Sequence, residues 1–254
     1  MKKIGLFFLI LLLTLAPSAS VRADEAESHS KLILLLEKSN HFYASVKNYS
    51  ALFQKQETSQ GVAGPKEKIF LKFEKPFKIF MGWLNTEKKG LQVVYERGRH
   101  GGKLAIHKPG LGLGLLPVIF LDQKSPWVRE GSQSYDIEDA GIGTFLTDFT
   151  EDLTRASAVH QVKVQFLEPL LPNQEETAEV IFEGSDKNSG YMAYRVIVSF
   201  EPKTALPVKM RLFDWDNQLM GEYAYENLKI NAASDDVEFK QQINRQLYRV
   251  YQGK

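Results

Sequence analysis

Hydrophobic and polar residues alternate over most of the middle of the chain, with the period of two that is typical of β-strands. The longest alternation places its apolar side chains at odd positions: Ile69, Leu71, Phe73, Phe77, Ile79, Met81 and Trp83. Because its phase is kept across Pro76, one face stays apolar through a bend or an edge site. The pattern predicts two strands that share an apolar face.

Shorter alternations follow, separated by turn residues. Val93 and Tyr95 precede the glycine-rich turn 98–102, and Leu104 and Ile106 follow it. Further strands are predicted within 162–166, 180–182, 194–200, 208–212 and 219–230. Segments 184–190 and 214–218 are typical of hairpin connections, so we expect a large antiparallel sheet.

Helical periodicity is confined to three places. An amphipathic helix is predicted over 27–47, a second over 144–156, and a short final one from near Asp235. The chain shows no repeat and no linker. It is therefore predicted to be one α+β, mainly β, domain whose sheet either packs on itself or curls around a cavity.

The N-terminus has the features of a secretory signal peptide. Lys2 and Lys3 precede an apolar run, and small residues lead to Ala23. We expect a signal peptide over 1–23, cleavage after Ala23, a single domain over 24–254 and a periplasmic product; an uncleaved anchor is the alternative. The sequence has no cysteine, which excludes a lipidated N-terminus, disulfides and thiolate chemistry.

Charge and motifs exclude several function classes. The net charge is +1, and the expected cleavage leaves a near-neutral chain, which argues against nucleic-acid binding. The stretch "HKPGLGLGLLPVIF" (107–120) lacks the Gly-Lys-Ser/Thr end of a phosphate loop, so it is a loop that covers apolar surface or borders a pocket.

Catalytic and metal sites are not indicated. The five histidines lack metal-ligand spacing, and no nucleophile motif is present. The segment 214–217 favours a hairpin turn over half of a calcium loop. We therefore expect no enzyme activity, no cofactor and no metal.

Two groups of cations are notable. Arg97, Arg99, His100 and Lys103 surround the glycine-rich turn and either contact anions at a membrane surface or form a solvated hairpin end. Lys75 interrupts the apolar row; it has a buried partner or extends outwards at the bend before Pro76.

The order of these parts resembles the LolA-like superfamily of periplasmic lipoprotein carriers. The resemblance lies in "IFLKFEKPFKIFMGW" (69–83), "YERGRHGGKLAIHKPG" (95–110) and "LPVKMRLFDWDNQLMGEYAYENLKIN" (206–231). Within the superfamily, the chain is most similar to an exported branch defined as a domain of unknown function.

The resemblance implies a strongly curved antiparallel half-barrel, with helices as a lid over an apolar cavity that shields acyl chains. In these carriers an arginine before the strand proline helps to keep the lid closed. Lys75 stands at that position here and lacks the planar fork of arginine. This departure argues against the closing mechanism of a true carrier. Trp83 lies seven residues beyond Pro76, further than in a typical carrier, and the segment 110–140 is elaborated; both points favour the branch of unknown function over a lipoprotein shuttle.

The expected function is non-enzymatic binding of a lipid or a lipoprotein acyl chain by a monomer that contacts the membrane transiently. The expected cavity is lined by Leu71, Phe73, Phe77, Ile79, Met81, Trp83, Tyr95 and Ile106. The leucine lip, Leu111, Leu113, Leu115 and Leu116, is expected to cover it, with Lys75, Arg97 and Arg99 as anion or lid contacts. An envelope sensing or protein-interaction module is the alternative. A hydrolase is a third class, but it requires a cluster of polar catalytic side chains that the sequence does not indicate.

Overall fold

The computed structural model describes residues 19–59, 61–109, 118–126, 136–168, 174–232 and 237–253. The expected signal peptide is therefore only partly described. Within this part of the chain, no helix combines the length and apolar character needed to span a membrane.

One open antiparallel sheet forms the body of the protein, which confirms the predicted fold class. The path through the sheet runs β7-β6-β5-β4-β3-β1-β12-β11-β10-β9-β8, with β2 paired to β1 off this path. The strands are β1 Asn48–Ser59, β2 Val62–Ala63, β3 Glu67–Glu74, β4 Lys78–Trp83, β5 Gln92–Glu96, β6 Leu104–His107, β7 Ile119–Leu121, β8 Val162–Leu167, β9 Glu176–Phe182, β10 Arg195–Phe200, β11 Pro207–Phe213 and β12 Leu219–Ile230.

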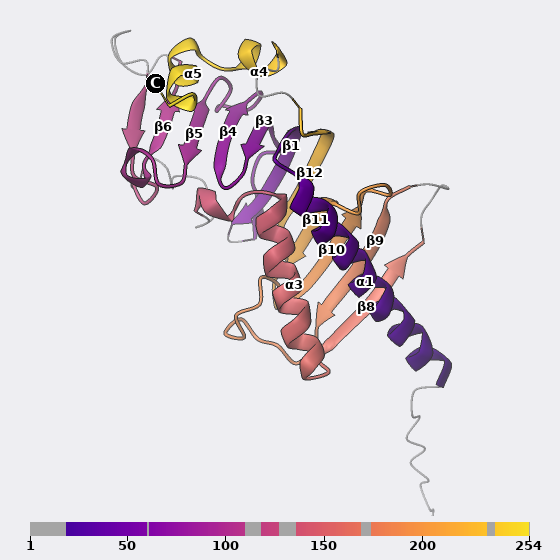
Figure 1. The fold of residues 1–254 in the computed structure, drawn as a ribbon. Helices are drawn as coiled ribbons and strands as arrows, with labels where there is room; N and C mark the ends of the chain where they lie inside the picture. Colours follow the sequence, from indigo (N-terminus) through magenta and orange to yellow (C-terminus); the bar gives the residue numbers. More distant parts are fainter. Residues whose placement is uncertain are drawn as a thin grey trace, which may run out of the picture.

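The topology explains why the sheet is curved but not closed. Long strands β1 and β12 pair at its centre, and two antiparallel meanders extend outwards from them. β7 and β8 therefore lie at opposite edges, and the accumulated strand twist rotates the two halves relative to each other (Figure 1). The result is a half-barrel.

Two long helices cover one face of the β8–β11 half (Figure 1). They are α1 Ala19–Ser45 and α3 Ile142–Ala158, and they correspond to the first two predicted helices. The first begins eight residues earlier than the periodicity predicts and includes the last residues of the expected signal peptide. Nε2 of His29 lies 2.8 Å from Oγ of Ser157, which ties α1 to α3.

The final predicted helix is two short helices, α4 Val237–Gln242 and α5 Arg245–Tyr251. The described 3-10 turns are η1 His100–Gly102 and η2 Ile137–Asp139. Asn244 caps α5 by accepting hydrogen bonds from the main-chain N–H groups of Gln246 and Leu247. Segments 184–190 and 214–218 connect β9 to β10 and β11 to β12, as predicted for hairpins.

The β3–β6 half is buried on both faces, which the sequence interpretation missed. Residues on the outer face of these strands form a second cluster with residues of α4 and α5 and the segment between them: Phe70, Phe80, Val94, Ala105, Phe239, Ile243, Leu247 and Tyr251. The signal was available, because Ile69-Phe70-Leu71 and Ile79-Phe80-Met81 are continuous apolar runs. Such runs are typical of strands that are covered on both sides.

Candidate functional site

The residues expected to line a cavity lie together on the concave side of the sheet. Strand pairing sets Leu71 opposite Met81, and Phe73 opposite Ile79, which in turn pairs with Tyr95. We call the eight residues Leu71, Phe73, Phe77, Ile79, Met81, Trp83, Tyr95 and Ile106 the concave floor. Trp83 and Ile106 are partly buried and the other six are buried.

Aromatic rings run along this floor. The ring centroids of Tyr49 and Phe73 are 5.1 Å apart, those of Phe73 and Phe77 are 5.3 Å apart, and those of Phe77 and Tyr95 are 5.9 Å apart. These separations fall in the range of favourable aromatic pairs. The floor is therefore part of the main core in this state, and the two pockets described below are lined by other residues.

The leucine lip, Leu111, Leu113, Leu115 and Leu116, lies outside the described residues. Its flanks are described: β6 ends at His107, and β7 begins at Ile119 beside it. Its covering role thus stays a prediction from the sequence.

Lys75 joins the turn between β3 and β4 to the end of α1. Its Nζ donates a 2.6 Å hydrogen bond to the main-chain oxygen of Tyr43 and lies 3.5 Å from that of Ala44. The ammonium also lies 4.2 Å from the centroid of the Tyr43 ring. Partial desolvation lowers the pKa of Lys75. Of the two sequence alternatives, the side chain that extends outwards at the bend is the one observed.

Arg97 and Tyr95 join β5 to η2, just before α3. The Arg97 guanidinium lies 2.9 Å from Oε2 of Glu138, and the Tyr95 hydroxyl donates to Oε1 of the same carboxylate. These hydrogen bonds, first that from Tyr95, lower the pKa of Glu138, although burial opposes them. Burial, and next the bond to Glu138, raise the pKa of Tyr95 to about 12, so this phenol remains a donor.

The beginning of α3 also contacts β1 and α1. The main-chain N–H of Ile142 donates to the hydroxyl of buried Tyr49 at 3.1 Å. A Cβ atom at Gly143 would overlap the ring of Tyr43 on α1, so glycine allows the two helices to approach closely there. We call these contacts, with those of Lys75 and Glu138, the helix latch.

Arg99 does not belong to the latch. Its guanidinium donates to the main-chain oxygen of Gly253 at 3.4 Å, after the end of α5. The three cations expected to be anion or lid contacts, Lys75, Arg97 and Arg99, thus contact three different elements. These are α1, η2 and the C-terminal segment, respectively.

A polar network follows the floor at the far end of β1 and β3. Glu67, two residue pairs beyond Phe53 and Ile69, is buried and accepts from Nε1 of Trp83 at 2.9 Å and from Nζ of Lys88 at 2.6 Å. Burial would raise the pKa of Glu67, but these two hydrogen bonds and the nearby cations lower it overall. The sequence interpretation missed this network, whose only signal was a charge within the apolar alternation.

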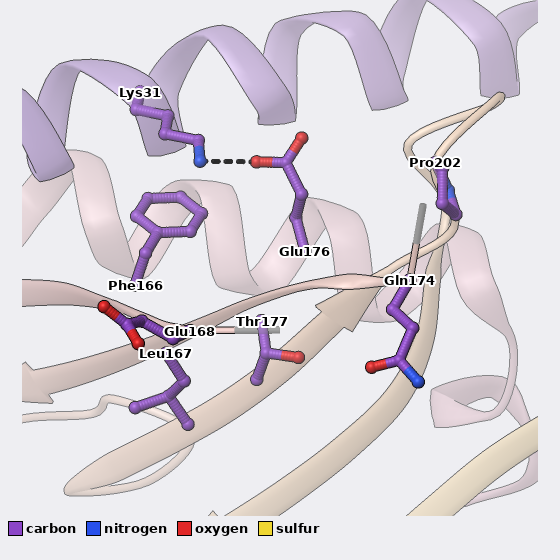
Figure 2. Close-up of a pocket in the computed structure, with 8 residues that line it drawn as sticks. All are labelled: Lys31, Phe166, Leu167, Glu168, Gln174, Glu176, Thr177 and Pro202. Atoms are coloured by element: carbon purple, nitrogen blue, oxygen red, sulfur yellow. Dashed lines mark ion pairs between the residues drawn. The ribbon is translucent and has the colours of Figure 1, made fainter. Parts of the chain in front are cut away.

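Two pockets open on the other half of the sheet. One, of about 520 Å³, lies between α1 and the ends of β8 and β9, where Lys31 meets Glu176 above the Phe166 ring (Figure 2). The other, of about 610 Å³, lies beside β11 and β12 and has a mixed polar and apolar lining that includes Val208, Lys209 and Leu228. The described residues contain no cluster of three metal-binding side chains.

A family model described as a protein of unknown function (DUF1571) matches residues 46–248. Comparison with curated protein sequences gives no match. Solved structures similar to the chain include a LolA superfamily protein from Nitrosomonas europaea, with 11% identity, a TM-score of 0.36, and coverage of 83% of this chain and 96% of that protein.

Two further structures are similar to the chain. The lipoprotein LppX from Mycobacterium tuberculosis gives 7% identity, a TM-score of 0.45, and coverage of 82% of this chain and 99% of LppX. The MucA/MucB complex from Pseudomonas aeruginosa gives 14% identity, a TM-score of 0.43, and coverage of 86% of this chain but only 61% of the matched chain. Because these TM-scores lie below 0.5, no ligand or partner is transferred from these proteins.

Proposed function

Since the chain belongs to the DUF1571 family, whose function is unknown, we propose a function from the geometry of the site: it is a non-enzymatic carrier that holds an apolar ligand. The ligand is a lipid or a lipoprotein acyl chain bound against the concave floor. The observation that supports this most is that the floor is one continuous apolar surface beside helices attached through the helix latch.

The closed floor has to open for a ligand to enter. Five of its residues, Leu71, Phe73, Phe77, Ile79 and Tyr95, are at most 4% exposed. Displacement of η2 and the beginning of α3 would separate Glu138 from Tyr95 and Ile142 from Tyr49. An acyl chain would then replace the lost apolar contacts, at about 0.8 kcal/mol for each buried methylene.

The latch is suited to such opening because its polar contacts are few and partly solvated. The side chains of Arg97 and Glu138 are 53% and 34% exposed. Exposed ion pairs typically contribute only about 0.2–1 kcal/mol, so water can replace this one at low cost. The apolar packing of α3, through Phe145 and Phe149, opposes opening more strongly than these polar contacts do.

The expected export to the periplasm is part of this proposal, because a carrier of acyl chains acts between membranes. The leucine lip is proposed as the border of the same site. Replacement of its leucines by serine should weaken ligand capture and spare the fold.

Lipid extraction followed by native mass spectrometry tests the proposal. Protein purified from the envelope of its host should retain lipid, and the delipidated protein should bind a fluorescent fatty acid. Floor variant Met81→Lys should abolish binding, while Lys187→Met, in an exposed turn, should leave it unchanged. A folded, lipid-free protein that ignores fatty acids and lipoproteins would contradict the proposal.

A protein-interaction module remains the second candidate function. The observation that favours it is that the floor is filled by the protein's own side chains. An interaction module should give a stable complex on affinity purification, and an overpacking change such as Ala51→Trp should not affect that complex. The same change in a carrier should prevent ligand binding.

A further inference from the structure

The pocket between α1 and the ends of β8 and β9 already contains a cation from the protein itself. Nζ of Lys31 lies 2.6 Å from Oε2 of Glu176 and 4.1 Å from the centroid of the Phe166 ring (Figure 2). A carboxylate beside an aromatic face is a favourable environment for an ammonium or a guanidinium group. Glu168 lines the same pocket, so two carboxylates accompany one lysine.

The contacts that hold Lys31 in this position are partly solvated, so an external cation can compete with it. Its side chain is 50% exposed and that of Glu176 is 43% exposed. The pocket volume of about 520 Å³ lies within the roughly 300–1,000 Å³ of small-ligand sites, which leaves room for an external group. Leu167 and Pro202 give it apolar walls.

The adjoining strand offers main-chain groups to a ligand. β8 is the last strand on its side of the sheet and, among the described residues, pairs only with β9. Alternate residues of such an edge strand direct N–H and C=O groups outwards, and an added strand can pair with them. An edge lysine often discourages pairing, but Lys163 is neutralised by Glu183 at 2.5 Å.

We propose that an extended basic segment of a partner polypeptide binds at this edge. The segment adds to β8 as a further strand and places a lysine or arginine side chain over Phe166, between Glu168 and Glu176, in place of Lys31. An acidic segment would bring like charges to the two glutamates, so charge complementarity selects the basic one. The site does not require an apolar ligand on the concave floor.

Peptide binding to the unmodified full-length protein tests this directly. The probes are a fluorescein-labelled peptide of alternating valine and lysine, the same peptide with glutamate for lysine, and a lysine peptide N-methylated at alternate residues. Fluorescence anisotropy should show binding of the first peptide alone, because the second repels the pocket and the third lacks donors for β8. Equal binding of all three would overturn the proposal.

Variants separate a ligand site from a structural ion pair. Lys31→Met removes the internal competitor, so affinity for the lysine peptide should rise by up to about fivefold, as expected for loss of an exposed pair. Phe166→Leu should reduce affinity by about two- to fivefold through loss of the cation–aromatic contact. Lys187→Met is the control and should change nothing.

The Lys31→Met variant can also contradict the proposal. If Lys31→Met folds, as judged by an unchanged urea midpoint, and binds the lysine peptide no better than the wild type, the lysine is not a competitor and the proposal is wrong. If that variant does not fold, the Phe166→Leu variant and the three-peptide comparison decide the question.

Discussion

The ammonium of Lys75 donates a 2.6 Å hydrogen bond to the main-chain oxygen of Tyr43, in the last turn of α1. The last carbonyl groups of a helix lack intrahelical partners and form the negative end of its dipole. A cation from the turn between β3 and β4 thus neutralises the helix end at the border of the concave floor. This contact connects the sheet to its helical cover.

Replacement of Lys75 by methionine should lower the free energy of unfolding by about 1 kcal/mol, because one charged hydrogen bond and a favourable dipole contact are lost. Lys75→Arg should retain most of the stability. Urea unfolding at neutral pH measures the difference. The control is Lys68→Met, an exposed lysine on β3, and an equal loss in the control would refute the assigned contact.

The Glu138 contact predicts a pH dependence with a definite sign. Because hydrogen bonds from Tyr95 and Arg97 hold its folded-state pKa below the ordinary 4.5, its contribution to stability is complete above about pH 4.5 and is lost as pH falls through the folded pKa. Glu138→Gln should therefore cost about 1 kcal/mol at pH 7 and less at pH 3, where the contribution of the carboxylate has begun to be lost. Urea unfolding of both proteins at the two pH values checks this, and a pH-independent difference would contradict it.

Gly143→Ala should destabilise the protein although alanine favours helices. The new methyl group would overlap the Tyr43 ring, so α1 and α3 must separate locally. Overpacking of this kind typically costs about 1–3 kcal/mol, which exceeds the gain of about 1 kcal/mol in helix propensity. Thermal unfolding measures the net effect. Glu151→Ala on the exposed side of α3 is the control, and a stabilised Gly143→Ala protein would show that the helices do not meet there.

The second hydrophobic cluster, on the outer face of β3–β6, predicts that the C-terminal helices are integral to the domain. Leu247 is fully buried against the outer face of β3–β6. Leu247→Ala should lower the free energy of unfolding by about 2–4 kcal/mol. Arg249→Ala, on the exposed side of α5, should change it by less than about 0.5 kcal/mol. Similar small effects for both variants would indicate that α5 is not packed as described.

Most of the fold could be predicted because burial on one face leaves a period of two in the sequence. The alternation from Ile69 to Trp83 gave both strands and their shared face correctly, since Leu71 and Met81 are directly paired. The two-sided burial of Phe70 and Phe80 was missed because the prediction rested on the apolar row at odd positions alone. The covering segment, α4 and α5, lies more than 150 residues away in the chain, and no local pattern reveals that contact.

The candidate site was predicted less completely, for a physical reason. Apolar floor residues follow from periodicity, but the polar contacts depend on tertiary pairing. The partner of Arg97 is Glu138, and that of Lys75 is a main-chain oxygen of α1, which has no sequence signature. The Lys31–Glu176 pair could likewise not be predicted from the sequence, because it joins a helix to a strand far along the chain.

Photo-crosslinking with a diazirine-bearing palmitic acid tests the central claim most directly. After irradiation of the delipidated protein and peptide mapping by mass spectrometry, the account predicts adducts on concave-floor residues such as Phe73, Ile79 and Met81, and fewer adducts in Met81→Lys. Adducts confined to the outer face of the sheet, or none above an unfolded control, would contradict it.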